Sequence, residues 1–467
     1  MLFSSMVFIW FFLPIVFIGN FLLQRAGGNR ASNILLLLAS LFFYAWGEPV
    51  YIILMLVSIT VNWGSGLLLR AVRFQKTVLA ADVLVNIGLL GYFKYSGMVV
   101  DTICHFTGAQ IKKPEVALPI GISFFTFQAL SYVIDVYRKE VEAQRNWFHL
   151  ALYVSFFPQL IAGPIVKYKD VNEQIENRSI TLRKTALGIR RFTYGFAKKI
   201  LIANVMGQCA DRLYAMEINS LSSSMAWIAS IAYTLQIYYD FSGYSDMAIG
   251  LGSIFGFRFK ENFKYPYTSH SIREFWRRWH ISLSSWFRDY VYIPLGGNRK
   301  GTLRTYVNLF IVFLLTGIWH GASWTFVLWG IYHGLFCIIE RLGLEKFLER
   351  HHLISWIYTI LVVNFGWVFF RLDDLEKSLA IIARMLQPWR YSLSTYSLME
   401  LLSVKMILLI FAGIIGAGII RHIFKITGLK KKMQYSVIEI AYCSILFILC
   451  IMSLASSTYN PFIYFRF

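Results

Sequence analysis

One histidine lies deep inside an apolar stretch of this 467-residue sequence. His320 stands in L-L-T-G-I-W-H-G-A-S-W-T-F-V-L-W-G, where an ionisable side chain is costly and is functional by default. A neutral imidazole there can accept a proton from an attacking hydroxyl, because its unperturbed pKa is about 6.5. Gly317 and Gly321 would let a substrate chain or a neighbouring helix contact the ring. A histidine hydrogen-bonded between helices is the structural alternative.

A second histidine, His280, belongs to the segment R-E-F-W-R-R-W-H-I-S-L-S-S-W-F-R-D-Y at 273–290. Aromatic and leucine side chains recur in this segment at helical spacing, with basic and polar residues between them. This pattern predicts an amphipathic helix at the membrane interface, near the cytoplasmic headgroups. From the residues alone, an interfacial anchor and a catalytic element are both open.

A third polar cluster, Asp240, Tyr244, Ser245 and Asp246, interrupts another long apolar run. The two aspartates are six residues apart, so they do not stack on one helical face and do not favour a paired-carboxylate mechanism. A buried carboxylate could orient an imidazole or a basic side chain, or could make structural polar contacts between helices.

Other catalytic signatures are missing from the sequence. We find no G-x-x-x-x-G-K-[ST] phosphate loop, no G-x-S-x-G nucleophile elbow and no H-E-x-x-H zinc pair. The five cysteines are scattered and mostly lie inside apolar runs, which favours small core residues over disulfides or a metal site. We expect no metal and no permanently bound cofactor.

The elements that must position these residues are predicted to be membrane helices. Hydrophobic residues make up 57% of the chain and charged residues 15%, and the mean hydropathy is +0.55. Apolar runs recur from 3–23 to 436–455, which predicts an all-α integral membrane protein with about ten to twelve transmembrane helices. We expect one polytopic domain over 1–467, with 3–23 retained as its first helix.

The net charge of +20 fits basic cytoplasmic loops better than a nucleic-acid partner. Residues 167–199 hold nine basic residues against three acidic ones, and 258–304 hold ten against three, so both are placed inside. Basic residues also precede 147–165, a run interrupted by Pro158, Gly163 and Pro164. We therefore predict a re-entrant segment there, with its irregular backbone packed within protein.

Several long, ordered motifs resemble the membrane-bound O-acyltransferase (MBOAT) family, and within it the branch of alginate O-acetylases and peptidoglycan O-acetyltransferases. They include L-P-I-G-I-S-F-F-T-F-Q at 118–128, F-F-P-Q-L-I-A-G-P-I at 156–165 and Y-Y-D-F-S-G-Y-S-D at 238–246. F-W-R-R-W-H-I-S-L-S-S-W-F-R-D-Y-V-Y-I-P-L-G-G-N at 275–298 and G-I-W-H-G-A-S-W at 317–324 extend the resemblance over most of the chain.

The resemblance implies a ring of helices, with re-entrant and interfacial elements, around a central tunnel. It implies that His320 is the catalytic base and His280 the second functional histidine. The C-terminal F-x-Y-x-x-F pattern, filled by Phe462, Tyr464 and Phe467, implies that Tyr464 carries the acyl group. The residues expected to line the substrate passage are Trp319, Trp279, Asp240, Ser245 and Asp246.

The implied reaction moves an acetyl group from a cytoplasmic thioester, acetyl-CoA, across a bacterial cytoplasmic membrane. Arg273, Arg277 and Arg278 would attract the donor's phosphates. A secreted or membrane-anchored SGNH or serine-esterase-like partner would then acetylate a polysaccharide of the cell envelope or an exopolysaccharide. The alternatives are a non-enzymatic transporter or flippase of acylated precursors, and a lipid acyltransferase. The acceptor polymer and the oligomeric state cannot be read from the residues.

Overall fold

The computed structural model describes residues 1–391, 398–420 and 437–463. Every regular element in these ranges is helical, in agreement with the all-α prediction. Seven of the described helices are long and apolar enough to cross a membrane: Phe8–Ala45, Tyr51–Ala71, Gln75–Thr107, Thr302–His320, Trp324–Arg350, His352–Arg371 and Val437–Ser456. The chain is therefore a multi-pass helical membrane protein.

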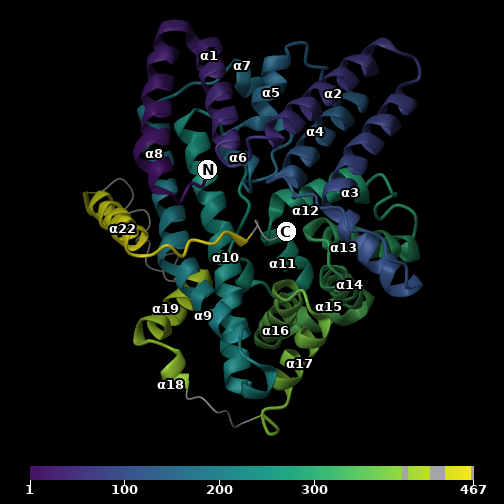
Figure 1. The fold of residues 1–467 in the computed structure, drawn as a ribbon, viewed down its shortest axis with the longest axis vertical. Coiled ribbons are helices and arrows are strands. Elements are labelled where there is room, and N and C mark those ends of the chain that lie inside the picture. Colours follow the sequence, from purple (N-terminus) through teal and green to yellow (C-terminus); the bar gives the residue numbers. More distant parts are fainter. Residues whose placement is uncertain (392–397, 421–436, 464–467) are drawn as a thin grey trace. The chain divides into compact units, whose positions relative to one another are not determined.

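Fewer helices meet these criteria than the ten to twelve predicted, and local structure explains the difference. Phe8–Ala45 contains two of the apolar runs, because the helix turns back at Gly28, whose φ of 63° only glycine adopts without strain (Figure 1). Helix α10 (Ser223–Ile254) is long enough but too polar to be included. Two more apolar helices, Ile122–Tyr137 and Val404–Ile419, are shorter.

The chain forms two compact units, Met1–Phe192 with Tyr244–Glu261, and Thr193–Gly243 with Asn262–Phe467. The boundaries between the units fall within the helices α8 (Leu182–Ala197) and α10 and in the segment that follows α10. The organisation as a single domain stays a prediction.

The first unit is built from the N-terminal helices and the end of α10. Its other elements are η1 (Phe8–Phe12), α1 (Leu13–Ala45), α2 (Tyr51–Ala71), α3 (Gln75–Thr107), α4 (Ile122–Tyr137), α5 (Trp147–Ser155), α6 (Phe157–Leu160), α7 (Tyr168–Glu176) and most of α8. The predicted re-entrant segment consists of α5 and α6, which are too short to span a bilayer. Residues 150–166 are buried, so their irregular backbone is packed within protein as expected.

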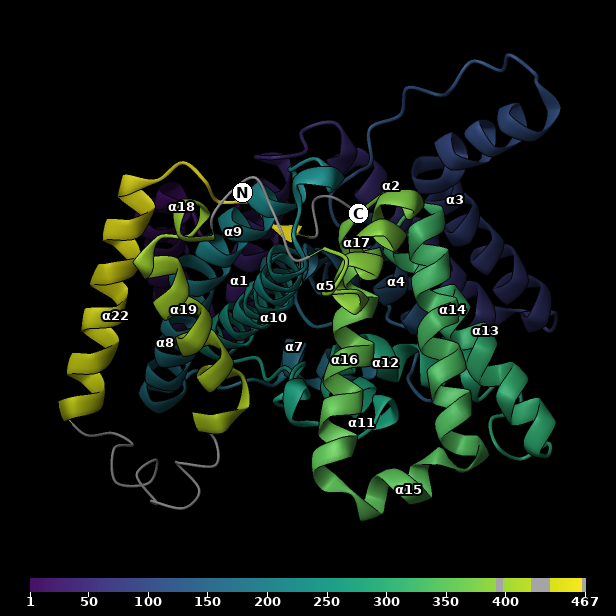
Figure 2. The same cartoon turned by 90° about the horizontal axis from the view of Figure 1, so that it is seen from below.

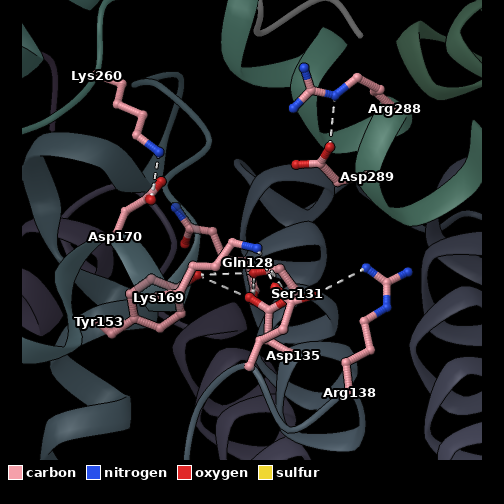
Figure 3. Close-up of polar contacts among 11 residues, drawn as sticks. Gln128, Ser131, Asp135, Arg138, Tyr153, Lys169, Asp170, Lys260, Arg288 and Asp289 are labelled. Atoms are coloured by element: carbon pink, nitrogen blue, oxygen red, sulfur yellow. Dashed lines mark hydrogen bonds and ion pairs between the residues drawn. The ribbon is translucent and has the colours of Figure 1, made fainter. Parts of the chain in front are cut away.

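A buried polar cluster holds α4 to its neighbours in this unit (Figure 3). Asp135 is fully buried and lies 4.0 Å from the ammonium group of Lys169, which also pairs with Glu140 at 2.5 Å. The hydroxyl of Ser131 lies 3.3 Å from that of Tyr153. Paired charges of this kind remove part of the cost of placing ionisable groups inside a membrane protein.

The second unit contains both candidate histidines. Its elements are η2 (Lys198–Ala203), α9 (Asn204–Tyr214), η3 (Ile218–Ser220), most of α10, η4 (Pro266–Thr268), α11 (Ile272–Arg278), α12 (Ile281–Phe287), η5 (Arg288–Tyr292), α13 (Thr302–His320), α14 (Trp324–Ile339), η6 (Glu340–Leu344), α15 (Glu345–Arg350), α16 (His352–Arg371), α17 (Leu375–Leu386), α18 (Leu398–Leu401), α19 (Val404–Ile414), η7 (Ile415–Ile419) and α22 (Val437–Ser456). Helices α13, α14 and α16 lie side by side, with α11 packed against α14 and α16 (Figure 2).

The segment 273–290 is not the continuous interfacial helix that its spacing predicted. Helix α11 ends at Arg278, and α12 begins only at Ile281. The break follows from His280, whose φ of 44° and ψ of 53° no right-handed helix accommodates. Its aromatic face is buried in protein: Phe275, Trp276, Trp279, Trp286 and Phe287 are each at most 8% exposed.

Candidate active site

His320 is fixed by a tight contact between two helices. It is the last residue of α13, and the chain then turns through 321–323 into α14. The two helices touch at Gly317, where a Cβ atom would lie 2.4 Å from the carbonyl oxygen of Phe326 and 3.0 Å from the Cα of Gly330. Of the two roles considered for Gly317, the close approach of a neighbouring helix is therefore the one observed.

Three aromatic side chains surround the imidazole of His320. Its ring centroid lies 4.9 Å from that of Trp319, 5.1 Å from that of Trp329 and 4.9 Å from that of Phe370. All three pairs are edge to face, and His320 is 4% exposed. These contacts fix the plane of the imidazole, which any proton transfer at a defined atom requires.

His280 is held at the corner between α11 and α12 by one asparagine. The amide of Ile281 donates to the carbonyl oxygen of Asn262 at 2.9 Å, and the amide and hydroxyl of Ser282 donate to the Asn262 Oδ1 at 3.0 and 2.9 Å. A left-handed conformation costs a residue other than glycine about 1–2 kcal/mol, and such strain clusters at functional sites. The backbone at His280 is therefore strained, and the hydrogen bonds to Asn262 hold it in place.

Trp319 connects the two histidines. Its ring centroid lies 4.9 Å from that of His320 and 6.1 Å from that of His280, and the His280 centroid lies 4.5 Å from that of Phe241. His280 is 1% exposed, and burial lowers the pKa of its imidazole to about 3. The ring is therefore neutral at physiological pH. The structure brings together three of the residues singled out in the sequence, His280, Trp319 and His320.

Trp279 lies next to His280 at the end of α11, but its neighbours form the aromatic core. Its ring centroid lies 4.9 Å from that of Trp367 and 5.0 Å from that of Phe263, and it is 3% exposed. Packing against these rings accounts for Trp279 without a substrate.

The three arginines of α11 have different surroundings. Arg273 pairs with Glu345, and Arg278 pairs with Glu274. Arg277 is exposed, and its Nε donates a 3.4 Å hydrogen bond to the carbonyl oxygen of Arg273. Arg277 is therefore the arginine best able to receive an anion.

Asp240 and Asp246 belong to separate ion pairs in separate units. Asp240 lies in the second unit, 2.7 Å from the ammonium group of Lys199. Asp246 lies in the first unit, 2.6 Å from the guanidinium of Arg191, and the neighbouring Ser245 is 2% exposed. Both aspartates face basic side chains, one of the two alternatives left open by their spacing. Tyr464 lies outside the described residues.

Two buried ionisable residues of α14 and η6 were missed in the sequence. His333 is fully buried, with its ring centroid 5.1 Å from those of Trp276 and Trp329. Glu340 is also fully buried and accepts the backbone N–H of Ile272 at 2.5 Å, at the start of α11. His333, like His320, is an ionisable residue within an apolar stretch, and this signal could have identified it.

These features define a class: a multi-pass helical membrane protein in which two buried histidines share an aromatic environment. A family model described as MBOAT, the membrane-bound O-acyltransferase family, matches residues 122–371, which include His280, His320 and His333. This match covers more than half of the chain, and relatives aligned over its full length agree with it. The protein belongs to the MBOAT family and is an O-acyltransferase.

Three named relatives show which proteins this chain is similar to. The chain is 42% identical to a probable alginate O-acetylase of Pseudomonas putida, over 100% of both chains. It is 37% identical to a peptidoglycan O-acetyltransferase of Helicobacter pylori, over 82% of this chain and 80% of the relative. A teichoic acid D-alanyltransferase of Bacillus subtilis is 29% identical over 46% of this chain and 57% of its own.

Proposed function

We propose that this O-acyltransferase transfers an acetyl group from cytoplasmic acetyl-CoA to an acceptor hydroxyl, with His320 as the general base. The observation that carries the proposal is the buried imidazole of His320, held between Trp319, Trp329 and Phe370 and linked through Trp319 to His280. The names of the relatives, an O-acetylase and an O-acetyltransferase, support acetyl as the transferred group.

In this reaction the imidazole of His320 removes the proton of the acceptor hydroxyl. The resulting alkoxide or phenoxide attacks the thioester carbonyl, an ester C–O bond forms, the C–S bond breaks and coenzyme A leaves as its thiolate. The proton on His320 then neutralises that thiolate. His280, neutral at physiological pH, positions the reacting groups from the far side of Trp319, and Trp279 supports His280 by packing within the aromatic core.

Arg277 is the primary contact for the donor's phosphates, because it is exposed while Arg273 and Arg278 are engaged by carboxylates. Electrostatic attraction of this kind raises the local concentration of an anionic substrate.

The acceptor on this proposal is Tyr464, which then passes the acetyl group to a secreted or membrane-anchored SGNH or serine-esterase-like partner. The partner esterifies an extracytoplasmic polysaccharide, and the protein resides in the bacterial cytoplasmic membrane. Alginate and peptidoglycan, named for two relatives, are the first polymers to assay.

The decisive experiment measures covalent acetylation of the purified full-length protein from labelled acetyl-CoA. His320→Ala should lower the rate by about 100- to 10,000-fold, the usual contribution of a positioned general base. His351→Ala is the matched control, because His351 is an exposed histidine of the same unit. Equal labelling of His320→Ala and wild type, with both proteins folded, contradicts the proposed base.

A further inference from the structure

The described end of the chain, residues 459–463, is bound along one face of η2 and α9. Phe462 and Ile463 are 4% and 6% exposed, and residues 459–461 are half-buried, so this segment packs within the second unit. Four residues of η2 and α9, namely Lys199, Asn204, Gly207 and Asp211, line this face together with Asp240 of α10. We call these five residues the tail groove.

The deepest part of the tail groove is the ion pair of Lys199 and Asp240. Their side chains are 3% and 1% exposed, and the Lys199 Nζ lies 2.7 Å from the Asp240 Oδ1. The same ammonium group donates to the carbonyl oxygen of Pro461. The other carboxylate oxygen, Asp240 Oδ2, accepts the backbone N–H of Ile463 at 2.9 Å. The pair thus binds the main chain of the tail on both sides of Phe462.

Further contacts continue along the tail towards α22. The side-chain amide of Asn204 donates to the carbonyl oxygen of Tyr459 at 3.3 Å. The hydroxyl of Tyr459 donates to Asp211 Oδ2 at 2.5 Å, and Asp211 is paired with Arg371 at 2.6 Å. Gly207 leaves room for this hydroxyl, which would lie 2.8 Å from a Cβ at that position. Residues 459–463 are therefore held at several points, as a bound peptide is.

The cost of burying the charges of Lys199 and Asp240 indicates that this ion pair is present to bind the tail. Burying two charges costs several kcal/mol per ion, and an apolar pair of similar volume often joins helices as well or better. Lys199 and Asp240 make hydrogen bonds to the main chain of the tail, which an apolar pair could not make. Charge-assisted hydrogen bonds of this kind are about twice as strong as neutral ones.

We propose that the tail groove docks the C-terminal tail, so that Lys199 and Asp240 are positioning residues that set the place of Tyr464 during acyl transfer. The role of Tyr464 rests on the proposed function, whereas the docking of residues 459–463 does not. Because Ile463 immediately precedes Tyr464 in the sequence, its hydrogen bond to Asp240 anchors the main chain next to the proposed acyl carrier.

The test compares charge-removing variants by hydrogen–deuterium exchange of the intact protein in detergent. Asp240→Asn weakens the hydrogen bond to the Ile463 amide and should speed its exchange by about tenfold to a hundredfold, the equivalent of one charge-assisted bond. The double variant Lys199→Met with Asp240→Leu separates docking from folding, because it replaces the pair with apolar side chains. It should keep the melting temperature close to that of wild type and still lose protection of the tail.

Glu261→Gln is the control, because it breaks an ion pair with Arg191 in the first unit and should leave exchange at Ile463 unchanged. Full protection of Ile463 in a folded double variant would overturn the docking proposal. Mass spectrometry of Tyr464 after incubation with acetyl-CoA gives the second readout. Tyr464 should be acetylated in wild type and much less in the double variant. An unacetylated Tyr464 in wild type would refute the carrier role while the exchange result still decides the docking.

Discussion

Substitution of Gly317 by alanine should displace His320 without removing any side chain. The new methyl group would lie 2.4 Å from the carbonyl oxygen of Phe326, whereas ordinary contacts begin near 3.4 Å, so α13 and α14 must separate locally by about 1 Å. His320 is three residues further along α13 and moves with that end of the helix. A misplacement of about 1 Å can cost about 100-fold in rate.

The assay is single-turnover acetylation of purified protein, at a temperature well below the melting temperature of each variant. Gly317→Ala should label about 100 times more slowly than wild type, with the estimate resting on the displacement above. Gly334→Ala is the matched control in the same helix pair. Its nearest contact would be the Cβ of Phe313 at 3.1 Å, which needs a shift of only a few tenths of an ångström. It should label at close to the wild-type rate.

Equal rates for folded Gly317→Ala and Gly334→Ala would refute the reasoning, because the glycine contact would then not control the position of the imidazole. A loss of folding in Gly317→Ala alone is recognised by a lowered melting temperature. In that event, Gly330→Ala addresses the same contact from α14, where the Cβ would lie 2.5 Å from the carbonyl oxygen of Phe313.

Two further predictions concern stability. Burial lowers the pKa of His280 to about 3, so the unfolded chain binds a proton that the folded chain does not between that value and about 6.5. The contribution of His280 to the free energy of unfolding should be fully present above about pH 6.5 and should fall by about 1.4 kcal/mol per pH unit below it. Thermal melts from pH 8 to 4.5 should show a smaller fall for His280→Asn. Glu340→Gln loses a charge-assisted bond to the start of α11 and should cost about 1.5–3 kcal/mol. A melting temperature equal to that of the exposed control Glu349→Gln would contradict the second prediction.

The hydrophobic pattern was enough to predict the helical membrane class. Together with Pro158, Gly163, Pro164 and the flanking basic residues, it also predicted the irregular segment at 147–165. It could not give the break at His280, because spacing reports which residues share a face and not whether one residue leaves the helical region. The break depends on Asn262, which is distant in sequence from α12 and holds the corner through long-range hydrogen bonds. Tertiary contacts of this kind override local periodicity.

Single residues could be singled out from the sequence, whereas contacts that depend on pairing could not. A histidine within an apolar run drew attention to His320, whose catalytic role stays a prediction, and the same signal at His333 was overlooked. The partner of Asp240 could not be predicted, because Lys199 lies 41 positions earlier in a basic stretch assigned to a cytoplasmic loop. The docking of the tail could not be predicted either, since it depends on main-chain hydrogen bonds that no side-chain pattern encodes.

The left-handed corner at residue 280 has a consequence for how this protein tolerates change. Glycine or asparagine would relax the backbone there, yet the chain keeps a bulkier imidazole in a conformation that it adopts only under strain. Variants chosen for heat resistance alone should therefore accumulate replacements at this position while their turnover declines. Thermostability and activity would then conflict at a single residue, which makes His280 a poor choice for any stabilisation campaign.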